Sequence, residues 1–324
     1  MWLMVVEVEK LVCPVDTLLM CGDKGASRPL GGQSKPYLYL HGTPLFIHVL
    51  KALGRIERIN RVFIIGDKQR LDHLLYTHAR AIKISKPVTT LNQWESLLSN
   101  VWNGFLATLD GYEPGDEERD RDIKNKVVFI LPGDAPLASP GEINEFFDKA
   151  DMTKLDHVTG LTSRNVMERY YPAKGKPGIK MAYFHFREGD YRINNLHMAR
   201  PFACANKQVI QQAYNSRYQK DIKNIVQLTK DMWERHVKLQ SLGLYFMMQV
   251  SMFLSFIRLA RLCEISSRYT PIGAVSAAVS RILGLRFGFA FTSKGGAALD
   301  IDNEGDYETM KSRYFEWKQM QAVD

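Results

Sequence analysis

Three short apolar runs, each stopped by a turn containing glycine or proline, constrain the fold of this chain more than any other feature. They cover residues 16–21, 61–66 and 126–131, and runs of this length bounded by turn residues are typical of buried strands. Between the first two, Pro44 opens a segment whose apolar residues recur at helical spacing, and proline suits the first turn of a helix. This alternation predicts an α/β fold with a mostly parallel, Rossmann-like sheet flanked by helices.

Further elements follow from local patterns. Residues 110–122 are dense in acidic side chains and contain glycine and proline, as is typical of a solvated loop. Ser139-Pro140-Gly141-Glu142 has the order of a helix start with a capping box. We also expect strand-like segments at 37–40, 181–186 and 286–291, and an amphipathic helix at 304–320.

The stretch from 206 to 285 is predominantly helical and apolar in pattern. We therefore expect three parts: an α/β core over 1–205, a helical appendage or insertion over 206–285, and a C-terminal strand and helix over 286–324 that complete the core.

The composition is that of a globular protein, with 45% hydrophobic and 24% charged residues in 324. A formal charge of +8 suits a polyanionic ligand such as a nucleotide. The basic residues are dispersed and no nucleic-acid-binding module is recognisable, so we expect no nucleic acid partner.

The four cysteines form no C-x-x-C pair, which argues against a structural zinc site and a disulfide framework. Cys21 lies inside an apolar run, so we expect it to be buried. Residues 1–10 lack the basic-then-apolar order of a signal peptide, which predicts a cytoplasmic location.

An almost uncharged segment at 242–257 is followed by Arg258, Arg261 and Arg268. Its sixteen residues fall short of the roughly 20 that span a bilayer. A buried helix and an interfacial helix anchored by its arginines both fit the pattern. The surrounding region, 242–290, is accordingly a candidate for a homodimer interface or for peripheral membrane contact.

Three features carry chemistry, and the first is the loop after the first strand. It contains Gly22, Gly25 and Arg28, and Lys35 follows. Glycines let backbone N–H groups approach phosphate oxygens, and basic side chains neutralise their charge. The spacing is neither that of a P-loop nor that of a dinucleotide-binding loop, so a basic surface turn explains it equally well.

The other two features are acidic. Asp134 follows the most hydrophobic strand, at the strand end where open α/β sheets bind ligands, although an acid there can also cap a helix. Asp300 and Asp302 follow a late strand, and strand alternation would put both on one side. Hard carboxylates together with phosphate oxygens are what Mg²⁺ prefers.

These features together resemble the nucleotidyltransferase family with a GT-A-like fold, which includes MobA-like NTP transferases and sugar-phosphate nucleotidyltransferases. The resemblance rests on LLMCGDKGASRPLGGQSKPYLYLHGTPLFIHVLKAL, on PGDAPLASPGEI and on LDIDNEGDYETM. It covers residues 16–66, 126–147 and 297–311, and no motif of the family is recognisable at 155–290. The first loop has two residues in each gap between its glycines and arginine where the family has one.

The resemblance implies roles for particular residues. Asp134 and Asp302 would be metal ligands, with Asp300 the less favoured alternative to Asp302. Lys35 would contact phosphate on the acceptor side, and Arg28 would clamp the triphosphate.

Three further residues would contact the nucleotide by the same resemblance. Gly22 and Gly25 would let the backbone wrap around it, and Ser96 would lie near the base or ribose. Acceptor contacts from the lysines around 174–180 or from the segment 192–195 are equally compatible with solvated turns.

The activity implied by the resemblance is Mg²⁺-dependent transfer of a nucleoside monophosphate from an NTP to a phosphorylated sugar, polyol or cofactor, with release of pyrophosphate. Two alternatives stay open. Asp300-Ile301-Asp302 has the Asp-x-Asp form that GT-A glycosyltransferases use for a nucleotide-sugar metal. The altered first loop would suit a non-catalytic nucleotide-binding regulatory module.

Overall fold

The computed structural model describes residues 14–24, 29–173, 175–216, 239–257 and 259–323. Its centre is an eight-stranded mixed sheet in the order β10-β7-β9-β6-β1-β4-β5, with β8 paired to β9. The pairs β1–β4, β1–β6, β4–β5 and β10–β7 are parallel, and β9 runs antiparallel to β6, β7 and β8. The predicted α/β class with a mostly parallel sheet is confirmed.

The strands of this sheet are short and mostly buried. They are β1 (Val15–Met20), β4 (Ile59–Gly66), β5 (Val88–Asn92), β6 (Val128–Pro132), β7 (His157–Ser163), β8 (Phe184–Phe186), β9 (Gly189–Ala199) and β10 (Phe287–Thr292). A separate two-stranded ribbon pairs β2 (Tyr39–Leu40) with β3 (Thr43–Pro44).

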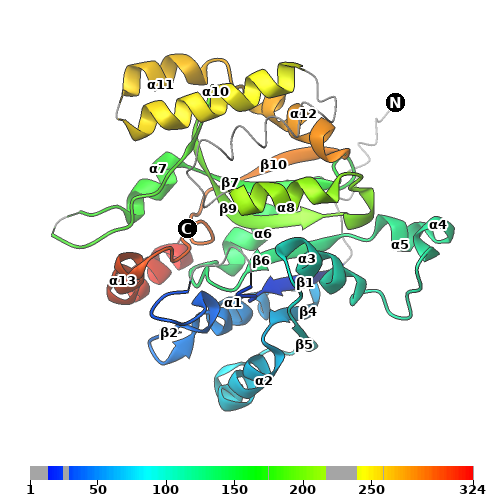
Figure 1. Ribbon diagram of the computed structural model, residues 1–324. Helices are drawn as coiled ribbons and strands as arrows, with labels where there is room; N and C mark the ends of the chain where they lie inside the picture. The colour runs from blue at the N-terminus through cyan, green and yellow to red at the C-terminus, as the bar shows by residue number, and fades with distance from the viewer. Residues whose placement is uncertain (1–13, 25–28, 174, 217–238, 258, 324) are drawn as a thin grey trace, which may run out of the picture.

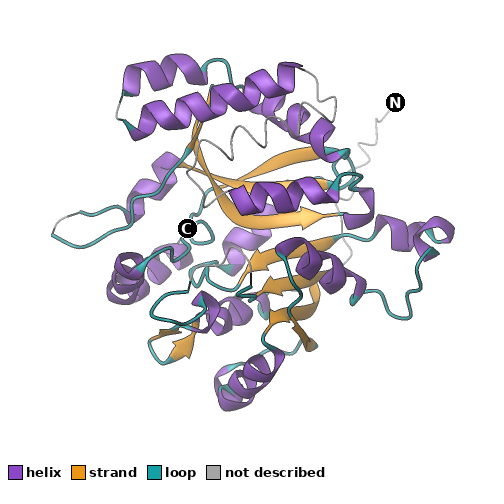
Figure 2. Cartoon of the chain, in the orientation of Figure 1, coloured by secondary structure: helices purple, strands orange, loops and turns teal. Residues whose placement is uncertain are grey.

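Helices cover both faces of the sheet, as Figure 2 shows. The longer ones are α1 (Leu45–Leu53), α2 (Lys68–Thr77), α3 (Leu97–Leu106), α6 (Pro140–Lys149), α8 (Lys207–Ser216), α10 (Leu239–Phe256), α12 (Ile272–Leu283) and α13 (Glu304–Val323). The shorter ones are a 3₁₀ turn (Lys35–Tyr37), α4 (Asp116–Arg119), α5 (Arg121–Asn125), α7 (Arg164–Met167) and α11 (Ala260–Ser267).

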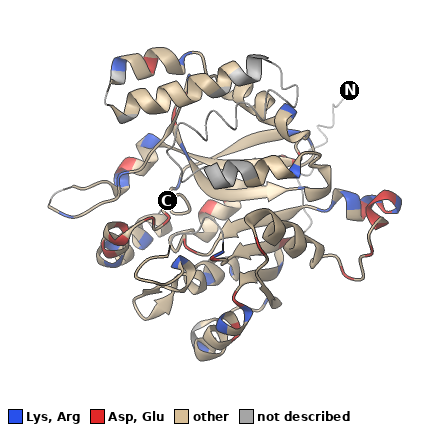
Figure 3. Cartoon of the chain, viewed as in Figure 1, with Lys and Arg blue, Asp and Glu red and all other residues tan. Residues whose placement is uncertain are grey.

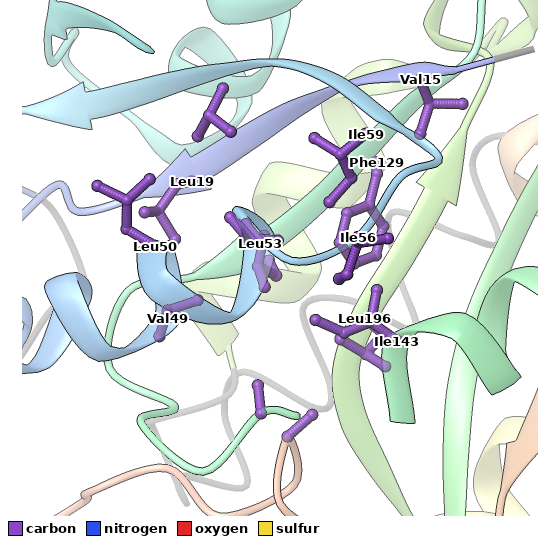
Figure 4. Close-up of a cluster of buried hydrophobic side chains, with 14 of the residues drawn as sticks. Val15, Leu19, Val49, Leu50, Leu53, Ile56, Ile59, Phe129, Ile143 and Leu196 are labelled. Atoms are coloured by element: carbon purple, nitrogen blue, oxygen red, sulfur yellow. The ribbon is translucent and has the colours of Figure 1, made fainter. Parts of the chain in front are cut away.

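The main core lies between one face of the sheet and helices α1, α2 and α6. Strand alternation directs Val15 and Leu19 of β1 and Phe129 of β6 to this face. They pack with Leu50 and Ile143, which lie on α1 and α6 (Figure 4). The opposite face packs on α3, α8, α12 and α10, so the sheet is covered on both sides as a parallel sheet requires.

The last helix, α13, packs over the edge of the sheet where β1 and β6 end. Its Met310, Tyr314 and Trp317 are buried against Leu40 and Leu45 of the β2–β3 ribbon and α1. This packing joins the C-terminal segment to the N-terminal third of the chain. It also brings the loop before α13, residues 293–303, over that sheet edge.

Several local predictions are wrong or only partly right. Residues 110–122 contain the short helix α4 and the start of α5 instead of a continuous loop, because Asp120 accepts hydrogen bonds from the backbone at Asp122 and Ile123 and so caps α5. The segment 37–40 holds the end of a 3₁₀ turn and the two-residue strand β2 instead of one strand. Only the second half of 181–186 forms a strand.

The predicted helical stretch contains α8, α10, α11 and α12, while residues 217–238 lie outside the described part of the chain. The division at 205 and 286 stays a prediction. Cys21, Cys204 and Cys263 are free and buried, as expected for Cys21, and Cys13 lies outside the described residues. None of the described helices is both long and apolar enough to cross a membrane.

Candidate active site

The candidate site lies at the carboxyl edge of the parallel strands, where open α/β sheets place their ligands. β1 ends here and passes into Cys21 and Gly22, and β6 ends here before Gly133 and Asp134. The β2–β3 ribbon, α7 and α13 lie on this side of the sheet (Figure 1).

The turn that carries Asp134 is fixed by close packing around Gly133. The N–H of Gly133 donates a hydrogen bond of 2.8 Å to the carbonyl of Met20. A Cβ at Gly133 would lie 2.6 Å from Sγ of Cys21 and 3.1 Å from Cβ of Phe46. No side chain fits there, so glycine is required for β6 to turn beside β1 and to place Asp134 at the sheet edge.

Lys35 and Asp302 meet at this edge although they are far apart in the sequence. Lys35 Nζ lies 3.1 Å from Asp302 Oδ1. The lysine is buried, whereas the aspartate side chain is 48% exposed. A buried ammonium whose partner still faces solvent can serve both as a structural ion pair and as a contact for an anionic ligand.

Asp134 interacts electrostatically with Lys35, Asp300 and Asp302. Its pKa is raised to about 6, first because burial disfavours the charged carboxylate and then because the negative charges of Asp300 and Asp302 lie nearby. The positive charge of Lys35 lowers it in part. The three aspartates and one lysine are therefore a cluster with an excess of negative charge.

Asp300 and Asp302 do not lie on one strand, which corrects the sequence prediction. Residues 298–302 form an irregular loop after β10, so strand alternation does not apply to them. Asp300 Oδ1 instead accepts a 2.6 Å hydrogen bond from Nη2 of Arg192, whose Nε donates to the carbonyl of Ala298. The two acids are thus held by different cations, Asp300 by Arg192 and Asp302 by Lys35.

The loop after β1 is anchored by Gln93, which follows β5. Its Oε1 accepts hydrogen bonds from the backbone N–H groups of Asp23 (2.8 Å) and Lys24 (3.3 Å), and its Nε2 donates to the Asp23 carboxylate. A Cβ at Gly22 would lie 3.0 Å from both Gln93 Oε1 and Asn100 Nδ2. Gly22 is therefore needed for close packing, while a nucleotide contact by its backbone stays a prediction.

Sequence reasoning gave Gln93 no role of its own. A single glutamine after a strand has no distinctive spacing that would have indicated one.

Ser96 has a structural explanation as the N-cap of α3. Its hydroxyl accepts a 3.1 Å hydrogen bond from the N–H of Ser99, as N-cap serines do. A ribose or base contact by Ser96 stays a prediction. Gly25 and Arg28 lie outside the described residues.

The described lysines suggested for an acceptor make no recorded contact with the aspartate cluster. Lys176 Nζ forms an exposed ion pair of 3.0 Å with Glu316 on α13, Lys180 is exposed, and residue 174 is not among those described. Of the segment 192–195, Arg192 reaches the aspartate cluster. Asn194 is buried, and its Nδ2 donates to Thr292 at 2.9 Å.

A second cation at this edge was missed by sequence reasoning. Arg164 opens α7 directly after β7, and its Nη1 lies 3.2 Å from Asp190 Oδ2. Next to it, the hydroxyl groups of Tyr171 and Tyr183 are 2.8 Å apart, and the guanidinium of Arg164 lies 5.8 Å from the Tyr183 ring centre. The sequence feature that could have indicated Arg164 is its position directly after the carboxyl end of a strand.

Within the described part of the chain, no group of three or more His, Cys, Asp or Glu side chains is arranged to hold a metal ion by itself. A cation here would take most of its ligands from phosphate and water. Mg²⁺ commonly binds in this way, through one or two carboxylates plus substrate phosphates.

Comparisons with solved structures show the fold. A hypothetical transferase from Thermus thermophilus shares 18% identity with this chain at a TM-score of 0.59, over 90% of this chain and 98% of that one. More distant are a 4-diphosphocytidyl-2C-methyl-D-erythritol synthase from Anaerococcus prevotii (10% identity, TM-score 0.46, 94% and 99% of the two chains) and a CMP:2-keto-3-deoxy-manno-octonic acid synthetase in complex with CTP (12%, 0.45, 94% and 98%).

A comparison with curated protein sequences finds no match. The sequence profile of the MobA-like NTP transferase domain matches residues 18–226, which include the second half of β1, all of β6 and the turn that bears Asp134. The chain therefore belongs to the MobA-like NTP transferase family and is an enzyme of the nucleotidyltransferase class.

Proposed function

We propose that this enzyme is a Mg²⁺-dependent nucleotidyltransferase that transfers a nucleoside monophosphate from an NTP to a phosphorylated small molecule and releases pyrophosphate. The observation that carries the proposal is the cluster of Lys35, Asp134 and Asp302 at the carboxyl edge of the sheet. The three residues are far apart in the sequence, and they lie near one another where β1 and β6 end.

The residues present suit a divalent cation. Burial is the main cause of the raised pKa of Asp134, and the negative charges of Asp300 and Asp302, which Lys35 offsets only in part, add to it. A bound cation would offset these charges further. Asp134 and Asp302 are the residues that would hold it. Mg²⁺ would supply neutralisation of phosphate charge and alignment of the reacting groups.

Polar groups for a phosphate are also available beside the cluster. Ser34 precedes Lys35, and its Oγ is buried without a hydrogen-bond partner among the described residues. Buried hydroxyl groups normally have a partner. A bound phosphate oxygen or an ordered water next to Lys35 would provide one.

The reaction itself requires no protein nucleophile. An ionised phosphate oxygen of the acceptor attacks the α-phosphorus of the NTP, a new P–O bond forms, and the bond between the α-phosphorus and the bridging oxygen to the β-phosphate breaks, so pyrophosphate leaves. Lys35 stabilises the negative charge on the phosphate oxygens in the transition state. The rigid turns at Gly133 and Gly22 hold the site, so positioning supplies a further share of the rate.

The nucleotide and the acceptor would bind at different halves of the sheet. The loop tied down by Gln93 lies at the β1–β4–β5 side and would hold the nucleotide. Arg164 and Arg192 lie at the β7–β9 side, beside Tyr171 and Tyr183. Guanidinium groups are suited to phosphate and carboxylate ligands, so this side would hold the acceptor.

The test is pyrophosphate release from each of the four NTPs with Mg²⁺ and a panel of sugar, polyol and cofactor phosphates. Asp134→Ala is measured alongside Asp122→Ala, a matched control that removes an exposed carboxylate on α5. Release that requires one NTP, one acceptor, Mg²⁺ and Asp134, and that persists in Asp122→Ala, supports the proposal. Release that is unchanged in Asp134→Ala, or that proceeds fully in the presence of EDTA, contradicts it.

A further inference from the structure

Helix α10 presents a stripe of large apolar side chains to solvent. Phe246 and Phe253 are 59% and 61% exposed, and Ile257, just beyond the helix, is 42% exposed. Their spacing of seven and four residues places them on one face. The opposite face of the same helix, with Leu244 and Met248, packs on the sheet and on α12.

Helix α11 continues this pattern. Leu262 and Ile265 are 49% and 50% exposed, and their spacing of three residues again defines one face. Tyr269, in the turn after the helix, is 67% exposed. The inner side of α11 is held to α10 by a 2.8 Å hydrogen bond between the hydroxyl groups of Ser251 and Ser266. The connecting turn adds a further exposed side chain, Leu259.

These outward stripes form an unusual concentration of apolar surface. Among the described residues, eleven large hydrophobic side chains are exposed, and seven of them lie between positions 246 and 269. Scattered exposed apolar residues are normal, but a contiguous group marks an interaction surface. Figure 3 shows no blue or red segment along α10, while α11 carries both colours.

The charges that do occur here are mainly positive. Residues 239–270 contain three arginines and one acid, Glu264. At 100° per residue, Arg261 and Arg268 border the apolar stripe of α11, and Glu264 lies further from it. Arg261 is exposed, and Arg268 is exposed while it pairs with Glu264 at 3.3 Å.

We propose that the α10–α11 surface, defined as Phe246, Phe253, Ile257, Leu259, Leu262, Ile265 and Tyr269 with the bordering arginines, docks on an anionic lipid surface. Apolar side chains would enter the boundary between headgroups and acyl chains while the arginines contact anionic headgroups. Because the opposite face of α10 packs on the sheet and α12, the contact would be peripheral.

Charge favours a lipid surface over a second copy of the chain. A twofold interface places the same patch of both copies against itself. The arginines that border the patch in both copies would then gather around one interface, with a single acid in each copy to offset them. An anionic membrane instead provides charges opposite to those that border the stripe.

The experiment is cosedimentation of the full chain with vesicles. Vesicles of equal parts phosphatidylglycerol and phosphatidylcholine are compared with pure phosphatidylcholine, at low and high salt. Three variants are measured: Phe253→Glu with Leu262→Glu, Arg261→Gln with Arg268→Gln, and Tyr76→Glu. Tyr76 on α2 is 84% exposed and serves as the matched control away from the surface.

We expect binding to the anionic vesicles that weakens at high salt. The Phe253/Leu262 variant should bind about 100-fold more weakly, since two large apolar side chains no longer enter the lipid. The arginine variant should lose about 30-fold, at about five-fold for each charge near the surface. Tyr76→Glu should bind as the parent does, and circular dichroism should show all variants folded.

Three results would overturn the proposal. One is the absence of binding to anionic vesicles at low salt. Another is binding that the arginine variant and the Phe253/Leu262 variant both retain while folded. The last is sedimentation equilibrium showing a dimer that the Phe253/Leu262 variant converts to a monomer, with no vesicle binding, because the surface would then join two copies.

Discussion

Lys35 Nζ and Asp302 Oδ1 lie 3.1 Å apart, and this ion pair joins two segments separated by 267 positions. The lysine follows the loop after β1, and the aspartate precedes α13. The pair therefore forms only when the C-terminal helix is packed against the β2–β3 ribbon. The proposed site therefore depends on the packing of the C-terminal segment against the N-terminal third of the chain.

The first prediction concerns this pair. Lys35→Met should lower kcat for pyrophosphate release by about 10²–10³-fold, the usual loss when one group that stabilises developing charge is removed. Asp302→Asn should lower it as well and should raise the Mg²⁺ concentration required. Because the two residues act as a unit, the double variant should lose less than the product of the single losses.

Steady-state kinetics at several Mg²⁺ concentrations check this prediction. Lys311→Met, which removes an exposed lysine on α13, serves as the control and should keep the parent kcat. If the loss of kcat in the double variant equals the product of the losses in the two single variants, Lys35 and Asp302 are not functionally coupled.

The second prediction concerns Asp300, which Arg192 holds at 2.6 Å. Its negative charge contributes to the raised pKa of Asp134, which is about 6. Removing that charge in Asp300→Asn should lower the pKa of Asp134. The acid limb of kcat/KM at limiting Mg²⁺ should then move to lower pH, since the carboxylate form of Asp134 persists further into acid.

A pH series of pyrophosphate release measures this limb. Asp122→Asn should leave it in place. An acid limb that moves to higher pH in Asp300→Asn would contradict the electrostatic coupling between Asp300 and Asp134.

Close packing at Gly133 gives the third prediction. Gly133→Ala would place a Cβ 2.6 Å from Sγ of Cys21, and overpacking of this kind typically costs about 1–3 kcal/mol. The turn that carries Asp134 would shift, so kcat should fall together with the free energy of unfolding. Cys21→Ala in the same chain removes the nearest atom and should restore part of both losses.

Partial rescue is expected because Phe46 Cβ and Pro36 Cβ would still lie 3.1 and 3.3 Å from the new methyl group. Urea unfolding and kinetics on the single and double variants measure the two effects. A Gly133→Ala enzyme with parent stability would show that the turn can move at no cost.

Much of the fold could be predicted from the sequence because several strands have a clear local pattern. β1, β4 and β6 appear as apolar runs ended by turns, and the turn after β6 pointed to Asp134. The expectation for 298–302 was wrong because chain segments after a strand need not continue its alternation. Arg192 lies on β9, far from Asp300 in the sequence. Its hydrogen bond to Asp300 is a tertiary contact, which no local sequence pattern predicts.

The same reasoning explains the helical region. The apolar run at 242–257 fits a buried helix and an interfacial helix equally well, because its residues are apolar on all sides. The structure shows a helix that is covered on one face only: Leu244 and Met248 pack against the sheet, while Phe246 and Phe253 are exposed. Which face of a helix is covered depends on its neighbours, and those are set by topology.

The fourth prediction concerns stability and pH, and it rests on Glu142 at the start of α6. This carboxyl is completely buried, and burial is the main reason that its pKa is raised to about 8. Its Oε2 accepts a 2.8 Å hydrogen bond from the N–H of Ala297, which lowers the pKa in part. The folded protein therefore keeps this proton at neutral pH, whereas the unfolded chain releases it near pH 4.5, the ordinary pKa of a glutamate.

Between these two pKa values the folded state binds more protons than the unfolded state, so the free energy of unfolding falls as pH rises. The expected slope from Glu142 is about 1.4 kcal/mol per pH unit inside this window, and it disappears above pH 8. Asp134 and the buried histidines His157 and His197 titrate at lower pH. His48 behaves in the same way, and because the ordinary pKa of these three histidines is 6.5, the unfolded chain releases their last protons just above pH 7 and adds a smaller rise in the free energy of unfolding. The difference between the parent and a Glu142 variant cancels this rise and isolates the contribution of Glu142.

Glu142→Gln keeps an oxygen that can accept from Ala297 and has no proton to lose. From pH 7 to 8 the free energy of unfolding of the parent should fall relative to that of Glu142→Gln, so the variant gains stability relative to the parent as the pH rises. Urea unfolding at three pH values measures the difference. Glu118→Gln, an exposed substitution on α4, should follow the parent, and parallel slopes for the parent and Glu142→Gln would show that Glu142 is already ionised in the folded protein at neutral pH.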